Sequence, residues 1–371
     1  MEPIYADALN LAKNLSASPK NLARIAQATT EDAARWAFSQ WALRDRAKAK
    51  FVLADEMLFD RDGLEMATHE GLAEYHATRF PQGSPVYDLT VGIGADLIAL
   101  ARRGPAIGFE IDPARAELAR HNLKAHGVEA EVRADSWEAL RSAENYFLDP
   151  ARRAGGRRTL DPRQFAPNPV DVVSRFHSVR VGVVKLSPML PDSFLETLGG
   201  RLEFVSFGGE CREALVLTGS DVEFGRFAVM PEAGAILPAL SGFAESVGVP
   251  GEFVYEADPA AIRANCLPEL CRRHELSQLA DSNGYLTGRR IAPSPWLKAF
   301  QVIASGKFDV AVVKRELAGL NSSTPILKQK GAGQDLIALR QKLNMKGTRE
   351  LAVALYRVGK SLRYAVLDAV R

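Results

Sequence analysis

The chain has 371 residues, of which 47% are hydrophobic and 25% are charged. This length predicts two or three domains, and the composition is typical of a soluble globular protein. No apolar stretch approaches the roughly 20 residues that span a bilayer, and the N-terminus lacks a secretory signal pattern. We therefore expect a cytoplasmic protein without a membrane partner.

The three cysteines and the distribution of charge further limit the kinds of site and partner that the protein is expected to have. Cys211, Cys266 and Cys271 have no C-x-x-C spacing and no nearby histidine pair, so neither a disulfide framework nor a metal site is expected. The net charge is +2, but residues 296–371 carry 14 Lys and Arg against 5 Asp and Glu, an excess of +9. A basic tail on an acidic body predicts a polyanionic partner such as RNA, unless it is only a solvated charged face.

Residues 1–80 are expected to form an N-terminal helical domain. Apolar residues recur at spacings of three and four in 21–28 and 30–41, which is the period of an amphipathic helix. A further helix is expected over 64–80. The Pro- and Gly-containing segment 81–85 is typical of a linker.

The segment after this linker carries the most informative pattern in the chain. Residues 86–89 predict a short buried strand that breaks into a turn with Gly92 and Gly94, and a helix follows. A second strand over 106–109 ends on Glu110. A carboxylate at the tip of the second strand of a βαβ unit can accept both hydroxyls of an adenosine ribose. The pattern therefore predicts a nucleoside-cofactor site.

The same turn indicates which cofactor is bound. A dinucleotide site requires a third glycine three residues after Gly94, where this chain has Leu97. Asp88, just before the turn, would repel a phosphate and favours a cationic ligand. S-adenosylmethionine (SAM) carries an ammonium group and a sulfonium and no phosphate, so it fits this turn.

Residues 86–230 alternate strands and helices, which predicts a doubly wound parallel sheet of the α/β class. Further strands are expected at 130–135, 145–149, 179–186, 201–207 and 213–218, the last two partly antiparallel. Ligand contacts in such sheets lie at the carboxyl ends of the strands. Asp88, Glu110, Asp135 and Asp149 all follow expected strands, so these four acids can converge on one site.

Four segments in this order resemble class I SAM-dependent methyltransferases: D-L-T-V-G-I-G at 88–94, G-F-E-I-D-P at 108–113, A-D-S at 134–136 and L-D-P-A at 148–151. The resemblance implies a Rossmann-like sheet and SAM as cofactor. In our assignment Asp88 lies near the methionine ammonium, Glu110 holds the ribose and Ile111 covers the adenine. The cofactor-binding residues assigned in this way are Asp88, Thr90, Gly92, Gly94, Glu110, Ile111, Asp135 and Ser136, with the last two facing the adenine amino group.

Residues 149–152 fall where amino-directed methyltransferases carry an Asn/Asp-Pro-Pro-aromatic motif. Asp149 and the carbonyl of Pro150 would accept hydrogen bonds from the target amine, which predicts a base nitrogen such as guanine N2. Here Ala151 replaces the second proline and Arg152 replaces the aromatic residue, for which a guanidinium can substitute by stacking. This departure leaves the target atom open.

The motif also resembles the D-P-P-R of pyrimidine-C5 RNA methyltransferases, which need a cysteine nucleophile. Cys211 is the only candidate, and its neighbour Glu210 would raise rather than lower the pKa of the thiol.

The basic run 151–163 follows the motif directly and is suited to binding phosphates. Its candidate RNA-binding residues are Arg152, Arg153, Arg157 and Arg158.

A narrower resemblance covers essentially the whole chain. E-M-A-T-H-E at 65–70, L-D-P-A-R-R at 148–153, V-K-L-S-P at 184–188 and the basic tail resemble bacterial class I methyltransferases with a C-terminal THUMP-like domain. The resemblance implies a structured RNA substrate, tRNA or rRNA, with Lys328 and Lys330 as further contacts. An inactive RNA-binding protein and a protein or small-molecule methyltransferase remain alternatives.

The expected domains are therefore a helical domain at 1–80, a methyltransferase domain at 81–230, a connecting region at 231–295 and a small α/β THUMP-like domain at 296–371. In the last domain short strands are expected at 310–314, 326–330, 351–357 and 364–367.

Overall fold

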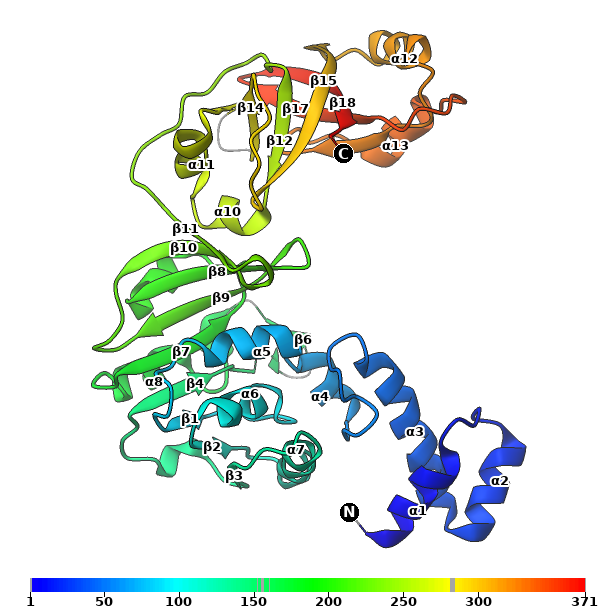
Figure 1. Cartoon of the computed structure of the whole chain (residues 1–371), viewed down its shortest axis with the longest axis vertical. Helices are drawn as coiled ribbons and strands as arrows, with labels where there is room; N and C mark the ends of the chain where they lie inside the picture. Colours follow the sequence, from blue (N-terminus) through cyan, green and yellow to red (C-terminus); the bar gives the residue numbers. More distant parts are fainter. Residues whose placement is uncertain (1, 152, 155–156, 160, 281–283, 371) are drawn as a thin grey trace. The chain divides into compact units, whose positions relative to one another are not determined.

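The computed structural model describes residues 2–151, 153–154, 157–159, 161–280 and 284–370 (Figure 1). The chain divides into two compact units. The first comprises Met1–Leu186, Leu190–Gly200 and Val216–Glu223, and the second comprises Ser187–Met189, Arg201–Leu215 and Phe224–Arg371. Within the described residues, no helix combines the length and the apolar character needed to cross a membrane.

The first unit begins with five helices and continues with alternating strands and helices. Its helices are α1 (Pro3–Ala12), α2 (Pro19–Ala28), α3 (Glu31–Ala47), α4 (Arg61–Met66), α5 (Glu70–Ala77), α6 (Ala95–Arg103), α7 (Pro113–Ala125), α8 (Pro169–Arg175) and α9 (Asp192–Leu195). Its strands are β1 (Val86–Asp88), β2 (Ala106–Phe109), β3 (Glu131–Arg133), β4 (Asn145–Leu148), β5 (Arg153–Ala154), β6 (Arg157–Arg158) and β7 (Val181–Leu186).

Five of these strands are parallel neighbours in the order β3-β2-β1-β4-β7. Helix α6 packs on β1 and β2, and α7 packs on β3 (Figure 1). Helix α7 begins at Pro113 because the side chain of Asp112 accepts hydrogen bonds from the next free backbone N–H groups. The chain returns across β1 between β3 and β4, so the strand order reverses there, and a ligand crevice forms at such a point.

The N-terminal helices belong to the same compact unit as these strands. Residues from α1, α2 and α3 form one buried apolar cluster, against which Leu118 of α7 packs. The buried amide of Asn122 accepts a hydrogen bond from the Leu58 backbone (2.8 Å) and donates to the carbonyls of Leu58 (3.0 Å) and Ile93 (2.9 Å). The region expected as a separate domain at 1–80 is therefore joined to the turn after β1.

The helix expected over 64–80 is divided into α4 and α5. Ala67 takes an extended backbone conformation at the end of α4, and the side chain of His69 caps α5. The ammonium group of Lys50 donates to the carbonyls of Leu64 (2.8 Å) and Ala67 (2.7 Å), which satisfies backbone groups that the end of α4 leaves without partners. The break exposes residues 67 and 68 to the site described below.

The second unit contains most of the remaining strands. Its elements are β8 (Arg201–Phe207), most of β9 (Glu210–Thr218), β10 (Gly225–Met230), β11 (Ala235–Pro238), β12 (Phe253–Ala257), α10 (Pro259–Arg263), α11 (Leu267–His274), β13 (Ser277–Gln278), β14 (Tyr285–Gly288), β15 (Leu297–Lys307), α12 (Val310–Gly319), β16 (Ile326–Gln329), α13 (Leu336–Lys342), β17 (Ala352–Val358) and β18 (Ser361–Ala369). Strands β11, β10, β8 and β9 are hydrogen-bonded neighbours in that order, with β10 antiparallel to β11 and parallel to β8.

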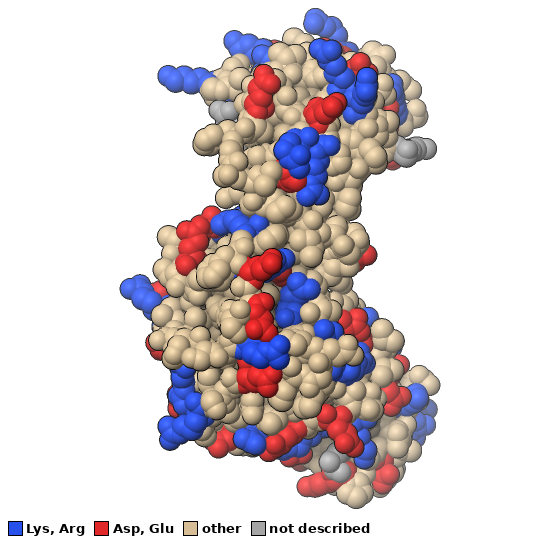
Figure 2. All heavy atoms as spheres, turned by 60° about the vertical axis from the view of Figure 1, so that its left-hand side comes forward, with Lys and Arg blue, Asp and Glu red and all other residues tan. Residues whose placement is uncertain are grey.

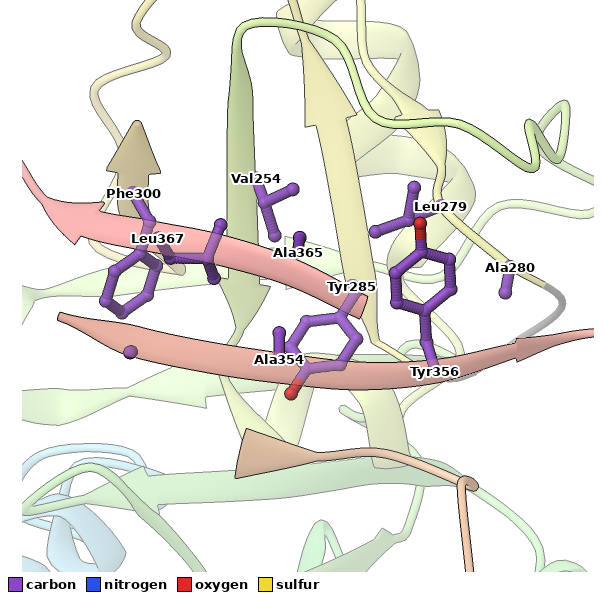
Figure 3. Close-up of a cluster of buried hydrophobic side chains, with 10 residues drawn as sticks. Val254, Leu279, Ala280, Tyr285, Phe300, Ala354, Tyr356, Ala365 and Leu367 are labelled. Atoms are coloured by element: carbon purple, nitrogen blue, oxygen red, sulfur yellow. The ribbon is translucent and has the colours of Figure 1, made fainter. Parts of the chain in front are cut away.

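A seven-stranded sheet, β13-β14-β12-β15-β18-β17-β16, forms the core of the second unit. Alternate residues of β17 and β18 point to opposite faces, as a strand requires. Ala354, Tyr356 and Leu367 belong to the cluster on one face (Figure 3), and Val353 and Val366 belong to the cluster on the other face, which includes residues of α12 and α13. Both faces of the sheet are therefore covered.

Two expectations for this region differ from the structure. The segment 310–314 was expected as a strand but begins helix α12, because the side chain of Asp309 accepts a hydrogen bond from the Val312 backbone and caps a helix there. Strands β12, β13 and β14 belong to the same sheet as β15 to β18, so the expected boundary at residue 296 falls within one sheet.

Candidate functional site

A cavity of about 610 Å³ lies at the carboxyl ends of the parallel strands of the first unit. Its lining comes from residues 89–93 after β1, 109–112 after β2, 136–138 after β3 and 149–151 after β4. Lys185 of β7 and residues 63 and 65–68 complete much of the wall. The strand ends that the sequence predicted to converge therefore surround one cavity.

The two glycines of the turn after β1 have different roles. Gly92 lines the cavity at φ 58°, and nothing lies within 4 Å of the position a Cβ would take. A side chain at Gly92 would thus enter the open space. Gly94, which was expected to make room for the cofactor as well, does not line the cavity. A Cβ on Gly94 would lie 3.3 Å from the backbone of Ala119, so this glycine instead lets α6 begin close to α7.

Glu110 is held on the cavity wall by two backbone groups. Its Oε2 accepts a hydrogen bond from Gly92 N (2.8 Å), and its Oε1 accepts one from Asp112 N (2.9 Å). A carboxylate has about four acceptor positions, so two remain for ligand hydroxyls. The adjacent Ile111 lines the cavity with 77% of its surface exposed, which suits the face of a planar group.

Asp88 does not line the cavity and is 1% exposed. Its Oδ1 accepts a hydrogen bond from Thr90 N (3.0 Å), and its Oδ2 has no hydrogen-bond partner. Burial, followed by the nearby charge of Asp96, raises the pKa of Asp88 well above its usual value. In this arrangement Asp88 shapes the turn and is not positioned as a surface charge for an ammonium group.

Of the two candidate residues after β3, one lines the cavity and the other does not. Ser136 lines the cavity, whereas Asp135 is exposed and accepts a hydrogen bond from Ser136 N (2.7 Å) without lining it. Trp137 also lines the cavity and was not predicted from the sequence. The guanidinium of Arg175 lies 5.3 Å from the centre of the Trp137 ring, at cation–π distance.

Asp149 and Pro150, the expected target-binding pair, both line the cavity. The backbone N–H of Asp149 donates to the hydroxyl of Thr90 (2.8 Å), which ties the turn after β4 to the turn after β1. Asp149 Oδ2 also lies 2.6 Å from the ammonium of Lys185. Sequence reasoning did not assign Lys185 to the site, although a single cation within the apolar strand V-G-V-V-K-L is an available signal.

The N-terminal region adds side chains that the sequence did not predict for the site. Met66 lines the cavity from the end of α4, Thr68 from the break between α4 and α5, and Arg115 from α7. Arg115 forms an ion pair with Asp60 (3.3 Å), the residue that caps α4. These contributions depend on contacts across long stretches of chain, which local patterns do not reveal.

The charge of the lining favours a cationic ligand. Among the described residues, six acidic and two basic residues line the cavity: Glu65, Asp96, Glu110, Asp112, Glu138 and Asp149 against Arg115 and Lys185. An excess of one sign attracts the opposite charge into a cleft. No group of three or more His, Cys, Asp or Glu in the described part of the chain is arranged to hold a metal ion.

Comparison with known proteins identifies the family. The chain is 32% identical over 342 residues to an uncharacterized SAM-dependent methyltransferase of Mycobacterium tuberculosis, found in the CDC 1551 and H37Rv strains, covering 88% of this chain and 94% of the relative. The chain belongs to the SAM-dependent methyltransferases. A provisionally named methyltransferase structure from Porphyromonas gingivalis W83 has the same fold, with a TM-score of 0.78, 18% identity and coverage of 99% and 98% of the two chains. No protein-family model matches the sequence.

SAM is therefore the cofactor of this methyltransferase, and the cavity fits it in two respects. The acidic lining suits the ammonium and sulfonium of SAM, and the open space at Gly92 admits a ligand close to the backbone. When bound, SAM supplies an electrophilic methyl group.

Cys211, the alternative nucleophile, has the properties of an inert thiol. It does not line the cavity of the methyltransferase. Burial, followed by the charge of Asp258, raises the pKa of Cys211 to about 12. The direction agrees with the sequence prediction, but the main cause is burial and not Glu210, which forms an ion pair with Arg212 (3.0 Å). A thiol with this pKa is almost entirely protonated at neutral pH.

The candidate RNA-binding residues lie in two places. Arg152 lies outside the described residues, and Arg153, Arg157 and Arg158 belong to the short hairpin of β5 and β6. In the second unit, Lys328 and Lys330 are less accessible than expected. Lys328 forms an ion pair with Glu256 (2.6 Å), and burial lowers the pKa of Lys330.

Other basic residues of the second unit are exposed, among them Lys314 and Arg315 on α12, Arg340 and Lys342 on α13, and Lys346. On the face of the molecule drawn in Figure 2, Lys and Arg side chains stand singly or in small groups, with Asp and Glu side chains among them. These helix residues are thus more accessible than the paired Lys328 of β16 and the half-buried Lys330 that follows it.

Proposed function

We propose that the protein methylates a base nitrogen in structured RNA, tRNA or rRNA, with guanine N2 as the expected atom. The observation that carries this proposal is the position of Asp149 and Pro150 on the lining of the cavity of a SAM-dependent methyltransferase. Hydrogen bonds from the target amine to the Asp149 carboxylate and the Pro150 carbonyl would direct the nitrogen lone pair at the methyl group. Such alignment is a large part of catalysis in a bimolecular displacement.

The cofactor contacts in this proposal follow the lining of the cavity. Glu110 accepts the ribose hydroxyls, Ile111 covers the adenine and Ser136 faces its amino group. Thr90 and Gly92 border the methionine part. The strand order β3-β2-β1-β4-β7 supports a Rossmann-like methyltransferase sheet.

The RNA substrate is supported by the charge of the C-terminal region. Residues 296–371 have an excess of nine positive charges, and several of them are exposed on or near α12 and α13. Phosphate contacts from Lys and Arg supply most of the sequence-independent affinity for nucleic acids. We propose that this part of the second unit, a THUMP-like domain, holds the RNA.

The test is methyl transfer to RNA from cells that lack the protein. Purified protein and isotope-labelled SAM are incubated with that RNA, and the nucleosides are analysed by mass spectrometry. We expect label in an N-methylated purine, absent from untreated RNA of the same cells. Label in a C5-methylated pyrimidine, or in protein and not RNA, would contradict the proposal. RNA binding without any thermal shift in S-adenosylhomocysteine would instead indicate an inactive RNA-binding protein.

A further inference from the structure

A chain of side-chain hydrogen bonds leads from the cavity into the interior of the first unit. The ammonium of Lys185 donates to Asp149 Oδ2 (2.6 Å) and to Thr68 Oγ1 (2.8 Å). Thr68 Oγ1 in turn donates to Asp96 Oδ2 (2.6 Å). Asp96 Oδ1 lies 2.7 Å from Nδ1 of His76, which donates to it. Lys185 therefore joins the expected target-binding carboxylate to a buried polar network.

The inner part of this network is rigidly held. His76 is fully buried and stacks on Phe147 with ring centroids 5.3 Å apart, and Thr68 and Asp96 are 5% and 8% exposed. Burial opposes ionisation of Asp96, but the hydrogen bond and charge of His76, with the charge of Lys185, lower its pKa overall. Buried polar groups that are fully hydrogen-bonded make a site rigid and specific.

The outer end of the network lies in the cavity. The side chains of Lys185 and Asp149 are 14% and 30% exposed, so their ion pair is only partly screened by solvent. A lysine side chain is long and flexible by itself. The bond to Thr68, which stands at the break between α4 and α5, gives Lys185 a second fixed point.

We infer that Lys185 is a positioning residue for methyl transfer, which fixes the carboxylate of Asp149 and is itself fixed by the Thr68–Asp96–His76 network. Holding one oxygen of Asp149 sets the plane of the carboxylate and thus the direction of the other oxygen. The inference rests on the proposed role of Asp149 in orienting the target amine. It also gives the N-terminal region a role in catalysis, because Thr68 belongs to that region.

The test compares Lys185→Met with Lys185→Arg and with Arg180→Met, a control that removes a cation at the other end of the same strand region. Arg180 pairs with Glu144 and Asp221 on the surface of the first unit. We expect Lys185→Met to lower kcat for RNA about 100-fold, the scale of a misplaced reacting group. Lys185→Arg should restore part of kcat, and Arg180→Met should match the wild type.

A binding measurement separates positioning from loss of structure. S-adenosylhomocysteine affinity, measured by calorimetry, should change less than about threefold in Lys185→Met, since its effect is on the target side. Thr68→Val removes only the hydroxyl link and should lower kcat in the same direction, whereas Thr68→Ser should not. If Lys185→Met does not fold, Thr68→Val decides the question.

Two results would overturn the inference in distinguishable ways. Wild-type turnover in Lys185→Met, or in Thr68→Val, with an inactive Asp149→Ala, would refute the role of Lys185 and leave the proposed function standing. Wild-type turnover in Asp149→Ala as well would refute both.

Discussion

The lining of the cavity in the first unit and the two buried clusters on the seven-stranded sheet of the second unit differ in the kind of side chain they contain. Around the cavity, Asp88 and Asp96 are buried, and the ion pair of Lys185 and Asp149 lines the wall. The two clusters on the faces of the seven-stranded sheet are aliphatic and aromatic (Figure 3), and exposed cations such as Arg340 lie at the surface. Burying charge costs free energy unless it is paired. Such groups often mark the site of chemistry, whereas surface cations serve binding.

The largest expected effect concerns Asp149. Asp149→Ala should lower turnover at saturating SAM and RNA by about 10²–10³-fold, the scale for removing one group that hydrogen-bonds in the transition state. SAM affinity should change little, because in the proposed arrangement the carboxylate contacts the target and not the cofactor. Asp171→Ala, which removes an exposed acid on α8, should leave turnover unchanged. Equal activity of both variants would mean that the catalytic turn lies elsewhere.

Glu110 should have the next largest effect, on affinity and not on turnover. Glu110→Ala removes a charged hydrogen-bond acceptor, which typically costs about 1.5–3 kcal/mol, or about 10–150-fold in SAM affinity. The substitution also removes the acceptor to which the backbone N–H groups of Gly92 and Asp112 donate hydrogen bonds. Calorimetric titration with SAM measures the effect, and a dissociation constant within twofold of wild type would remove Glu110 from the ribose site.

In the second unit, charge removal should weaken RNA binding without changing SAM affinity. The triple variant Arg340→Gln, Lys342→Gln and Lys346→Gln should flatten the slope of log K against log salt by about 0.7–0.9 for each phosphate that these side chains no longer neutralise. Lys328→Gln is the matched control, because Lys328 is already paired with Glu256. The same slope in the triple variant and the wild type would show that these cations are only a solvated face.

The smallest effect is expected at Cys211. Because burial raises the pKa of this thiol to about 12, its thiolate fraction, and thus its alkylation rate, should rise about tenfold per pH unit between pH 7 and 11. Iodoacetamide labelling followed by mass spectrometry measures this rate. Cys211→Ala should retain turnover within a few-fold. An inactive variant that no longer traps a covalent RNA adduct would instead indicate the pyrimidine-C5 class.

The sequence by itself determined the order of the elements around the cofactor. The second strand lies at Ala106–Phe109, as expected. The expected ends of the first, second and fourth strands all border the cavity. These predictions succeeded because glycines, prolines and helix caps act within a few residues, and the parallel order then brings the carboxyl ends of the strands together.

Only the tertiary structure decided which of the candidate side chains reach the cavity. Asp88, Gly94 and Asp135 were expected to bind the cofactor but do not line the cavity, whereas Trp137, which was not expected there, does. The short apolar run at 310–314 formed a helix, because a run of this length does not distinguish a strand from a buried helix.

The network of Lys185 shows why local patterns are insufficient. Lys185 contacts Asp149, 36 residues away, and Thr68, 117 residues away, and the Thr68 contact requires a break in what the sequence predicted as one helix. Hydrogen bonds across such separations depend on how strands and helices pack. The sequence shows which chemical groups are available to the site, whereas packing decides which of them meet. A charged side chain is costly to bury unless packing gives it a partner.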